Sequence, residues 1–165
     1  MRIATWNINS VRLRLPQVLK LVEDKKIDLL CLQETKTQDE FFPSEEFSKI
    51  GMKYQYYRGE KSYNGVAIIS NTKLTDTNYI NFCEKGDARH IFVKFKNDVE
   101  LHNFYVPAGG DEADVTMNPK FEHKISFLNE MKKNLCLLYT SDAADDSLRV
   151  DLGGRRIIKK LTVSY

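Results

Sequence analysis

Two short apolar segments near the start of the chain, separated by a helical segment, constrain its fold more than any other feature. "RIATWNIN", residues 2–9, has the composition of a β-strand and leads into "NS", a pair that favours a turn or a helix start. Apolar residues then recur at helical spacing from Leu15 to Val22, and Pro16 is acceptable in a first helical turn. "IDLLCLQ", residues 27–33, predicts a second strand, buried on both faces. A strand, a helix and a strand within about thirty residues predict a right-handed βαβ unit with parallel strands.

Shorter elements are predicted in the rest of the chain. "PSEEFSKIG", residues 43–51, has proline near its start, acidic residues in its first turn and glycine at its end, which predicts a short helix. A last amphipathic helix is predicted over residues 119–135. Between them lie predicted strands, of which the last two form a hairpin: "YQYYR" (54–58), "GVAIIS" (65–70), "TNYINF" (77–82), "HIFVKFK" (90–96) and "VELHNFYV" (99–106). This order predicts an α/β fold in which a mixed β-sheet carries helices on one face.

The overall composition is that of one globular domain of ordinary size. The 165 residues are 42% apolar and 29% charged, with a formal net charge of +2. This charge neither favours nor excludes a nucleic-acid partner, because a basic groove can lie within a balanced total. No apolar run is long enough to span a membrane, and no signal segment starts the chain. The three scattered cysteines favour a reducing compartment, so we expect a cytoplasmic protein without disulfides.

The composition changes once, near residue 135. "CLLYTSDAADD", residues 136–146, and "VDLGGRRIIKK", residues 150–160, resemble the conceptual translation of the two constant parts of a sequencing-library adapter. A linker followed by a small terminal strand is the alternative interpretation. Foreign segments are excluded from fold reasoning. We therefore expect residues 1–135 to be the genuine protein and residues 136–165 to be a non-native tail with no evolved role.

Polar residues at the ends of the first two strands predict a binding site. Asn7 and Glu34 should share one edge of the sheet, because parallel strands of a βαβ unit end on the same side, where ligands of open α/β sheets bind. An amide oxygen and a carboxylate are ligands suited to Mg²⁺. The alternative is that Glu34 is a solvated strand end, or that it pairs with Lys36 or Arg12.

Two further residues are candidates for contacting a phosphate. Tyr105 ends a predicted strand and precedes "PAGG", which exposes the strand end, so its phenol could hydrogen-bond a ligand. A tyrosine that is half core and half surface is the alternative. Arg89, in "GDARHI", could meet a polyanion, whereas an exposed arginine at a strand end is the commoner case.

Five segments occur in an order and spacing that resemble a known family: "ATWNINSVRLR" (4–14), "DLLCLQETK" (28–36), "YNGVAIIS" (63–70), "DARHI" (87–91) and "FYVPAGG" (104–110). Taken together, they resemble bacterial exonuclease III, in the apurinic/apyrimidinic (AP) endonuclease branch of the endonuclease/exonuclease/phosphatase superfamily. The resemblance covers residues 1–135 nearly end to end. "LQET" is shared across the superfamily, whereas "NINSVR" followed by "LQETK" is more specific to the DNA-repair branch.

The resemblance implies a fold, a cofactor and a substrate. The fold would be the N-terminal part of a four-layered α/β sandwich, in which two sheets pack face to face with helices outside. Asn7 and Glu34 would bind Mg²⁺, or Mn²⁺ in its place, with Glu34 the main ligand. Tyr105 would be the catalytic tyrosine at the scissile phosphate, and Arg89 would lie near the DNA. The substrate would be double-stranded DNA with abasic sites or 3′ ends, and the enzyme would be a monomer.

The chain also departs from the family. The family's "GDxN" segment, which supplies a water-activating aspartate, and its terminal "SDHxP" segment, which supplies a catalytic histidine, do not occur in the sequence. We therefore expect an N-terminal half that is inactive alone. Two alternatives remain: another phosphoesterase of the superfamily, acting on lipid or inositol phosphates, or a non-catalytic fragment.

Overall fold

The computed structural model describes residues 1–138 of the chain, and the side chains of residues 1–135. Residues 1–105 belong to one compact unit, and the described residues from 106 onward belong to a second. Each unit is considered by itself. All four candidate site residues lie in the first unit.

The first unit begins with the predicted βαβ arrangement. Strands β1 (Ile3–Asn7) and β2 (Leu29–Gln33) are parallel neighbours, and helix α1 (Val11–Lys25) connects them. Strands β3 (Tyr54–Arg58) and β4 (Val66–Ser70) complete a sheet with the order β1-β2-β4-β3, in which β4 is antiparallel to both neighbours. The predictions for these elements are confirmed.

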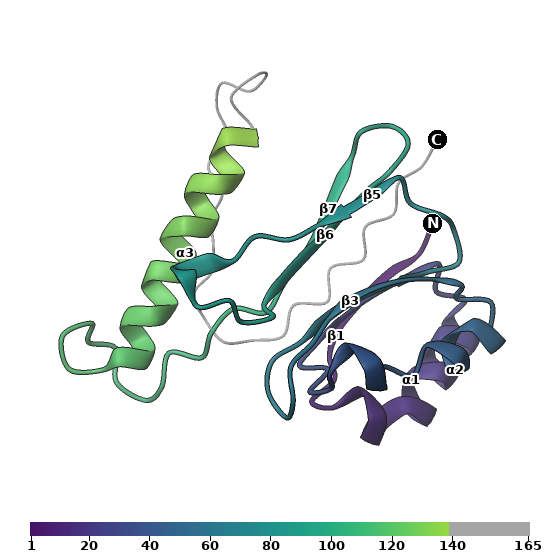
Figure 1. The fold of residues 1–165 in the computed structure, drawn as a ribbon, viewed down its shortest axis with the longest axis horizontal. Helices are drawn as coiled ribbons and strands as arrows, with labels where there is room; N and C mark the ends of the chain where they lie inside the picture. The colour runs from purple at the N-terminus through teal and green to yellow at the C-terminus, as the bar shows by residue number, and fades with distance from the viewer. Residues whose placement is uncertain (139–165) are drawn as a thin grey trace. The chain divides into compact units, whose positions relative to one another are not determined.

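Helices α1 and α2 (Ser44–Lys49) cover one face of this sheet (Figure 1). Apolar side chains of the helices and of the sheet form a shared core there: Ile8, Val11, Val18, Val22, Leu30, Leu32, Phe42, Phe47, Met52, Ala67 and Ile69. Because α1 already begins at Val11, Pro16 lies in its second turn, which corrects the prediction of a first-turn proline. The helix starts this early because Val11 is fully buried and its N–H donates to the Thr35 carbonyl at 3.0 Å.

The remaining strands form a second sheet, which corrects the single mixed sheet predicted from element order. Strands β5 (Asp76–Asn78), β6 (His90–Lys94) and β7 (Glu100–Phe104) are antiparallel in that order, and β6 and β7 form the predicted hairpin. The strand predicted over residues 77–82 ends at Asn78. It ends there because the Ile80 N–H donates to His90 Nδ1 at 2.9 Å instead of to a neighbouring strand.

The two sheets of the first unit pack face to face, as the family resemblance implied. Strand β4 lies against β6 and β7, and β2 lies against β7. Their buried apolar side chains form a second core between the sheets: Leu29, Cys31, Val66, Ile68, Leu74, Ile91 and Val93. The first unit thus contains a helical layer, a mixed sheet and an antiparallel sheet.

The second unit contains helix α3 (Pro119–Leu138). Asn118 caps its start, because its Oδ1 accepts the N–H groups of Lys120 at 3.0 Å and Phe121 at 3.4 Å. The helix was predicted to end at Leu135 and continues to Leu138. None of the helices within the described part of the chain is long and apolar enough to cross a membrane.

Candidate active site

The ends of β1 and β2 bring Asn7 and Glu34 together. Asn7 is opposite Gln33 in the parallel pair, so Glu34 follows directly beyond the last paired position. The Asn7 Nδ2 group donates a hydrogen bond of 2.7 Å to Glu34 Oε1. The amide oxygen of Asn7 makes no part of this bond, so it and the carboxylate can face one ligand.

Lys36 is the cation beside Glu34, one of the two pairing partners that the sequence left open. Its ammonium lies 3.1 Å from Glu34 Oε2, and it also donates to Asn9 Oδ1 at 2.5 Å. The ion pair is mostly buried, because the side chains of Lys36 and Glu34 are 32% and 19% exposed. Lys36 therefore partly neutralises the carboxylate and places a positive charge beside the strand ends.

The backbone after β2 adopts a conformation that side-chain-bearing residues rarely use. Glu34 has a φ of 54° and Lys36 a φ of 50°, both in the left-handed region. Two backbone hydrogen bonds hold the segment. The Ser10 N–H donates to the Glu34 carbonyl at 2.7 Å, and the Thr35 N–H donates to the Gly65 carbonyl at 3.2 Å. This turn points the Glu34 side chain along the sheet edge toward Asn7. Strained backbone held by its surroundings is common at functional sites.

Gly65 is required beside this turn. Its φ is +92°, and a Cβ atom built there would lie 2.0 Å from the Thr35 hydroxyl oxygen. No side chain larger than hydrogen fits without moving Thr35, which follows Glu34 directly. The sequence segment "YNG" therefore holds a glycine that shapes the site, a role that no spacing rule had indicated.

Tyr105 joins the site from the second sheet. Its hydroxyl lies close enough to the Glu34 carboxylate for each group to shift the pKa of the other. Burial and then the interaction with Glu34 raise the pKa of Tyr105, while the nearby Arg89 guanidinium opposes them. The tyrosine therefore stays protonated and can donate its hydrogen.

The ionisation of Glu34 follows from the same contacts. Burial by itself raises the pKa of Glu34, but hydrogen bonds from Asn7, Lys36 and Tyr105 together outweigh it and leave the pKa below its usual range. The carboxylate is thus charged at neutral pH, as a metal ligand must be.

Arg89 is held against Tyr105 by an acid that the sequence reasoning did not single out. Its Nε donates to Asp87 Oδ2, and both side chains are nearly buried, at 15% and 14% exposure. The guanidinium lies 4.7 Å from the centre of the Tyr105 ring, and Nη1 donates to the Tyr105 carbonyl at 3.4 Å. Arg89 is therefore a fixed charge and not the exposed arginine at a strand end of the alternative interpretation. An acid two residues before it, in "GDARHI", was the available signal.

The oxygen atoms at this edge fit the predicted cation in type. Asn7 and Glu34 provide an amide and a carboxylate oxygen, which Mg²⁺ and Mn²⁺ prefer. Within the described residues, no group of three or more His, Cys, Asp or Glu side chains could hold a metal ion. A cation bound here would take oxygens from Asn7 and Glu34, and Lys36 would compete for the carboxylate.

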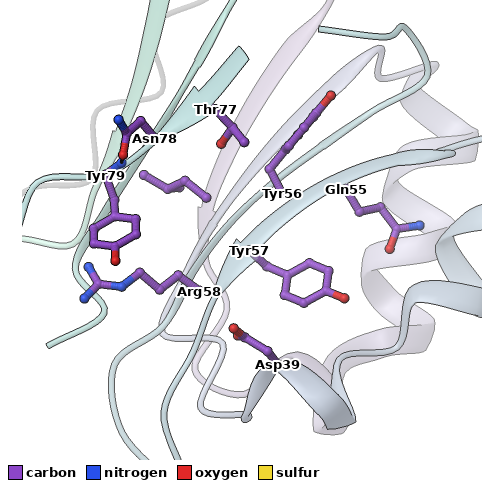
Figure 2. Close-up of a pocket in the computed structure, with 9 residues that line it drawn as sticks. Asp39, Gln55, Tyr56, Tyr57, Arg58, Thr77, Asn78 and Tyr79 are labelled. Atoms are coloured by element: carbon purple, nitrogen blue, oxygen red, sulfur yellow. Dashed lines mark hydrogen bonds between the residues drawn. The ribbon is translucent and has the colours of Figure 1, made fainter. Parts of the chain in front are cut away.

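An open pocket of about 490 Å³ lies elsewhere in the first unit, at the edge strands β3 and β5 (Figure 2). Its lining includes Arg58, which stacks on Tyr79 with 4.0 Å between the guanidinium carbon and the ring centre. Arg58 Nη2 also donates to Asn81 Oδ1 at 2.5 Å and to the Gly86 carbonyl at 3.0 Å. These contacts attach the segment before Asp87 to the first sheet. None of the four candidate site residues lines this pocket.

Comparison with known proteins identifies relatives for this arrangement. The model of the endonuclease/exonuclease/phosphatase family matches residues 4–155. Exodeoxyribonuclease III from Haemophilus influenzae is 29% identical over 140 residues, which are 82% of this chain and 51% of the relative. An exodeoxyribonuclease from Bacillus subtilis is 26% identical over 162 residues, which are 92% of this chain and 62% of the relative. The family match runs past residue 135, so the boundary placed there stays a prediction.

Solved structures agree with these relatives in fold. The 3′ phosphatase NExo from Neisseria, solved with a product DNA hairpin, has a TM-score of 0.75 and 31% identity over 86% of this chain and 53% of its own. An AP endonuclease from Archaeoglobus fulgidus has a TM-score of 0.72 and 33% identity over 82% of this chain and 51% of its own. The chain thus spans about half the length of several of these relatives. By sequence and by fold, the chain belongs to the endonuclease/exonuclease/phosphatase family, among relatives that are exodeoxyribonucleases and AP endonucleases.

Proposed function

We propose that this chain supplies the metal-binding strand ends of a DNA-repair nuclease that hydrolyses DNA phosphodiester bonds with Mg²⁺, or with Mn²⁺ in its place. The observation that carries the proposal is the hydrogen bond from Asn7 to Glu34 at the ends of β1 and β2, with Tyr105 of the second sheet close enough to shift the pKa of Glu34. The nuclease relatives and the DNA-bound structural neighbour support the choice of DNA as substrate.

Each residue of the cluster has a role in the proposal. Glu34, ionised and aimed by its turn, is the main ligand of the cation, and the Asn7 amide oxygen is the second. A bound divalent cation would neutralise charge that develops on the phosphate and on the leaving oxygen. Tyr105 keeps its proton and donates it in a hydrogen bond to a phosphate oxygen. Lys36 and Arg89 supply fixed positive charges on either side.

The expected substrate is double-stranded DNA with an abasic site or a 3′ end, cleaved by a monomeric enzyme. The "NINSVR" segment favours DNA over the lipid and inositol phosphates of other superfamily members. A panel of abasic duplex, 3′-recessed duplex and phosphoinositide substrates separates these two classes.

The 165-residue chain is proposed to be inactive alone. It lacks the "GDxN" and "SDHxP" segments, and with them the aspartate and histidine that the family resemblance assigns to water activation and catalysis. Residues 136–165 are proposed to be a non-native tail. The reading frame downstream of Leu135 at the genomic locus tests this, because a locus that encodes the same tail contradicts it.

The activity test compares two proteins on one abasic-site duplex. The protein translated from the uninterrupted reading frame is expected to nick the duplex in Mg²⁺ and to lose activity in EDTA, and the 165-residue chain is expected not to nick it. Equal activity of the longer protein in EDTA would overturn the metal assignment. Nicking by the purified chain, abolished by Glu34→Ala, would overturn its proposed inactivity.

A further inference from the structure

A buried asparagine lies between the two sheets, directly before the site. Asn103 is the fourth of the five residues of β7, opposite Ile91 of β6, and is 3% exposed. Because side chains alternate along a strand, Asn103 and Tyr105 project from the same face of β7, toward the first sheet. The surrounding core between the sheets is otherwise made of apolar side chains.

The Asn103 side chain makes three hydrogen bonds, all to the first sheet. Its Nδ2 group donates to the carbonyls of Leu32 in β2 and Ala67 in β4, at 2.9 Å each. Its Oδ1 accepts from Gln33 Nε2 at 2.6 Å. Gln33 also donates to the Thr5 hydroxyl at 3.0 Å, which extends the connection to β1. The Asn103 side chain of the second sheet is thereby hydrogen-bonded to two strands of the first sheet, β2 and β4, and is connected to β1 through Gln33.

The attachment points lie next to the residues of the candidate site. Leu32 and Gln33 directly precede Glu34, and Asn103 precedes Tyr105 by one intervening residue. Apolar contact between two sheets is non-directional and lets them shift relative to one another. Directional hydrogen bonds to fixed backbone carbonyls do not allow this. The side-chain connection from β7 to β2 therefore restrains the residues directly before Glu34 relative to the strand that ends directly before Tyr105.

Asn103 also contributes to stability, because an apolar side chain in its place would leave the Leu32 and Ala67 carbonyls and the Gln33 amide without this partner. The same hydrogen bonds end on the two residues before Glu34 and on β4, so they bear on the site as well. We propose that Asn103 is a positioning residue, which holds Tyr105 on Glu34 by fixing β7 to β2 and β4. Its functional meaning rests on the proposed role of Glu34 and Tyr105 in phosphate hydrolysis.

The test uses NMR on the 165-residue chain without metal. The wild-type chain should show nuclear Overhauser contacts between the Tyr105 ring and the Glu34 methylene protons, assigned with Tyr105→Phe. Asn103→Leu removes the three hydrogen bonds at similar size and is expected to lose these contacts. Val93→Ala is the matched control, because Val93 is fully buried in the same core and makes no such attachment, so it should be destabilised and keep the contacts.

Further variants and a second readout keep the outcome decisive. If Asn103→Leu does not fold, Gln33→Met removes only the bond to Asn103 Oδ1 and the bond to Thr5, and should weaken the same contacts. Bound Mn²⁺ should broaden the Tyr105 ring signals of the wild-type chain and of Val93→Ala. The broadening should be weaker in Asn103→Leu and in Gln33→Met. Unchanged Overhauser contacts in the folded variants would overturn the positioning role. Failure of the wild-type chain to bind Mn²⁺ would instead count against the proposed function, and the metal-free contacts would still decide the role of Asn103.

Discussion

Glu34 combines a strained backbone, an ion pair with Lys36 and a hydrogen bond from Asn7 in one residue. Its φ of 54° directs the carboxylate along the sheet edge, where Asn7, Lys36 and Tyr105 all reach it. A solvated strand end would need none of these partners. The same contacts that keep Glu34 ionised also occupy the oxygens that a cation would use. A cation would therefore compete with these groups for the Glu34 carboxylate.

This competition predicts the effect of removing Lys36. Lys36→Met takes away the positive charge 3.1 Å from Glu34 Oε2 and frees that oxygen. Mn²⁺ should then bind more tightly by about 1 kcal/mol or less, which is up to about fivefold in Kd, given the partial exposure of the pair. Titration followed by electron paramagnetic resonance measures the change. Lys49→Met, which removes an ammonium paired with Glu46 on α2, is the control and should leave Kd unchanged. Weaker binding in Lys36→Met would contradict the competition.

Replacement of Gly65 gives a second prediction about a single residue. Gly65→Ala should destabilise the fold by about 1–3 kcal/mol, because it combines a positive φ with a clash against Thr35. Gly86→Ala is matched in backbone, with a φ of +65°, but its Cβ would meet nothing within 4 Å. It should therefore show only the smaller backbone penalty, roughly 1–2 kcal/mol. Urea denaturation gives both values, and equal losses would show that the Thr35 clash is unimportant.

Among the elements, the hairpin of β6 and β7 carries a chain of side-chain hydrogen bonds on the face away from the first sheet. His90 Nδ1 accepts the Ile80 N–H at 2.9 Å, so His90 Nε2 must carry the hydrogen that it shares with His102 Nδ1 at 3.0 Å. His102 Nε2 then faces Glu100 Oε2 at 3.2 Å. His90 is thus neutral with its hydrogen on Nε2, and protonating its Nδ1 would break the bond from Ile80.

The buried, neutral His90 predicts a loss of folding stability in acid. Burial, followed by the charges of His102 and Arg58, lowers the pKa of His90 from 6.5 to about 3. Between these values the unfolded chain binds a proton that the folded chain excludes, so stability falls as pH decreases from 6.5 toward 3. The slope from this group approaches about 1.4 kcal/mol per pH unit. Urea denaturation across this range measures it, and His90→Gln, which cannot be protonated, should flatten the curve. An equally steep curve in His90→Gln would assign the slope to other groups.

The sequence allowed individual elements to be predicted, but not their grouping into sheets. The βαβ start was predictable, because its apolar periodicity and short length leave few other arrangements. The alternation of apolar and polar residues identifies the later segments as strands, but it does not show which strands pair with one another. The early end of β5 depends on a hydrogen bond between Ile80 and His90, residues ten apart in sequence, which no local pattern reveals. The separation into two sheets came only from the family resemblance.

The candidate site was predictable to a similar extent. The proximity of Asn7 and Glu34 follows from parallel strand ends and is observed. The position of Tyr105 beside them required the family resemblance, because β7 belongs to the other sheet. Asp87 and Asn103 act through buried polar contacts with residues that a spacing argument does not connect.

At the scale of the whole molecule, the chain belongs to the endonuclease/exonuclease/phosphatase family and spans about half the length of several relatives. Within the described residues, the first unit contains the cluster of Asn7, Glu34 and Tyr105 at the strand ends. The central claim is therefore that this cluster is a cation site before any activity is present, and it can be tested on the chain itself.

The direct measurement is Mn²⁺ binding to the 165-residue chain and to two single-charge variants. The wild-type chain should bind Mn²⁺, Mg²⁺ should displace it, and Glu34→Gln should weaken binding by at least about tenfold, because it removes the main ligand charge. Glu46→Gln removes the same charge from the surface of α2 and should bind like wild type. Circular dichroism checks that all three are folded. Equal Mn²⁺ affinity of folded Glu34→Gln and wild-type chain would contradict the assignment of the cation to the ends of β1 and β2.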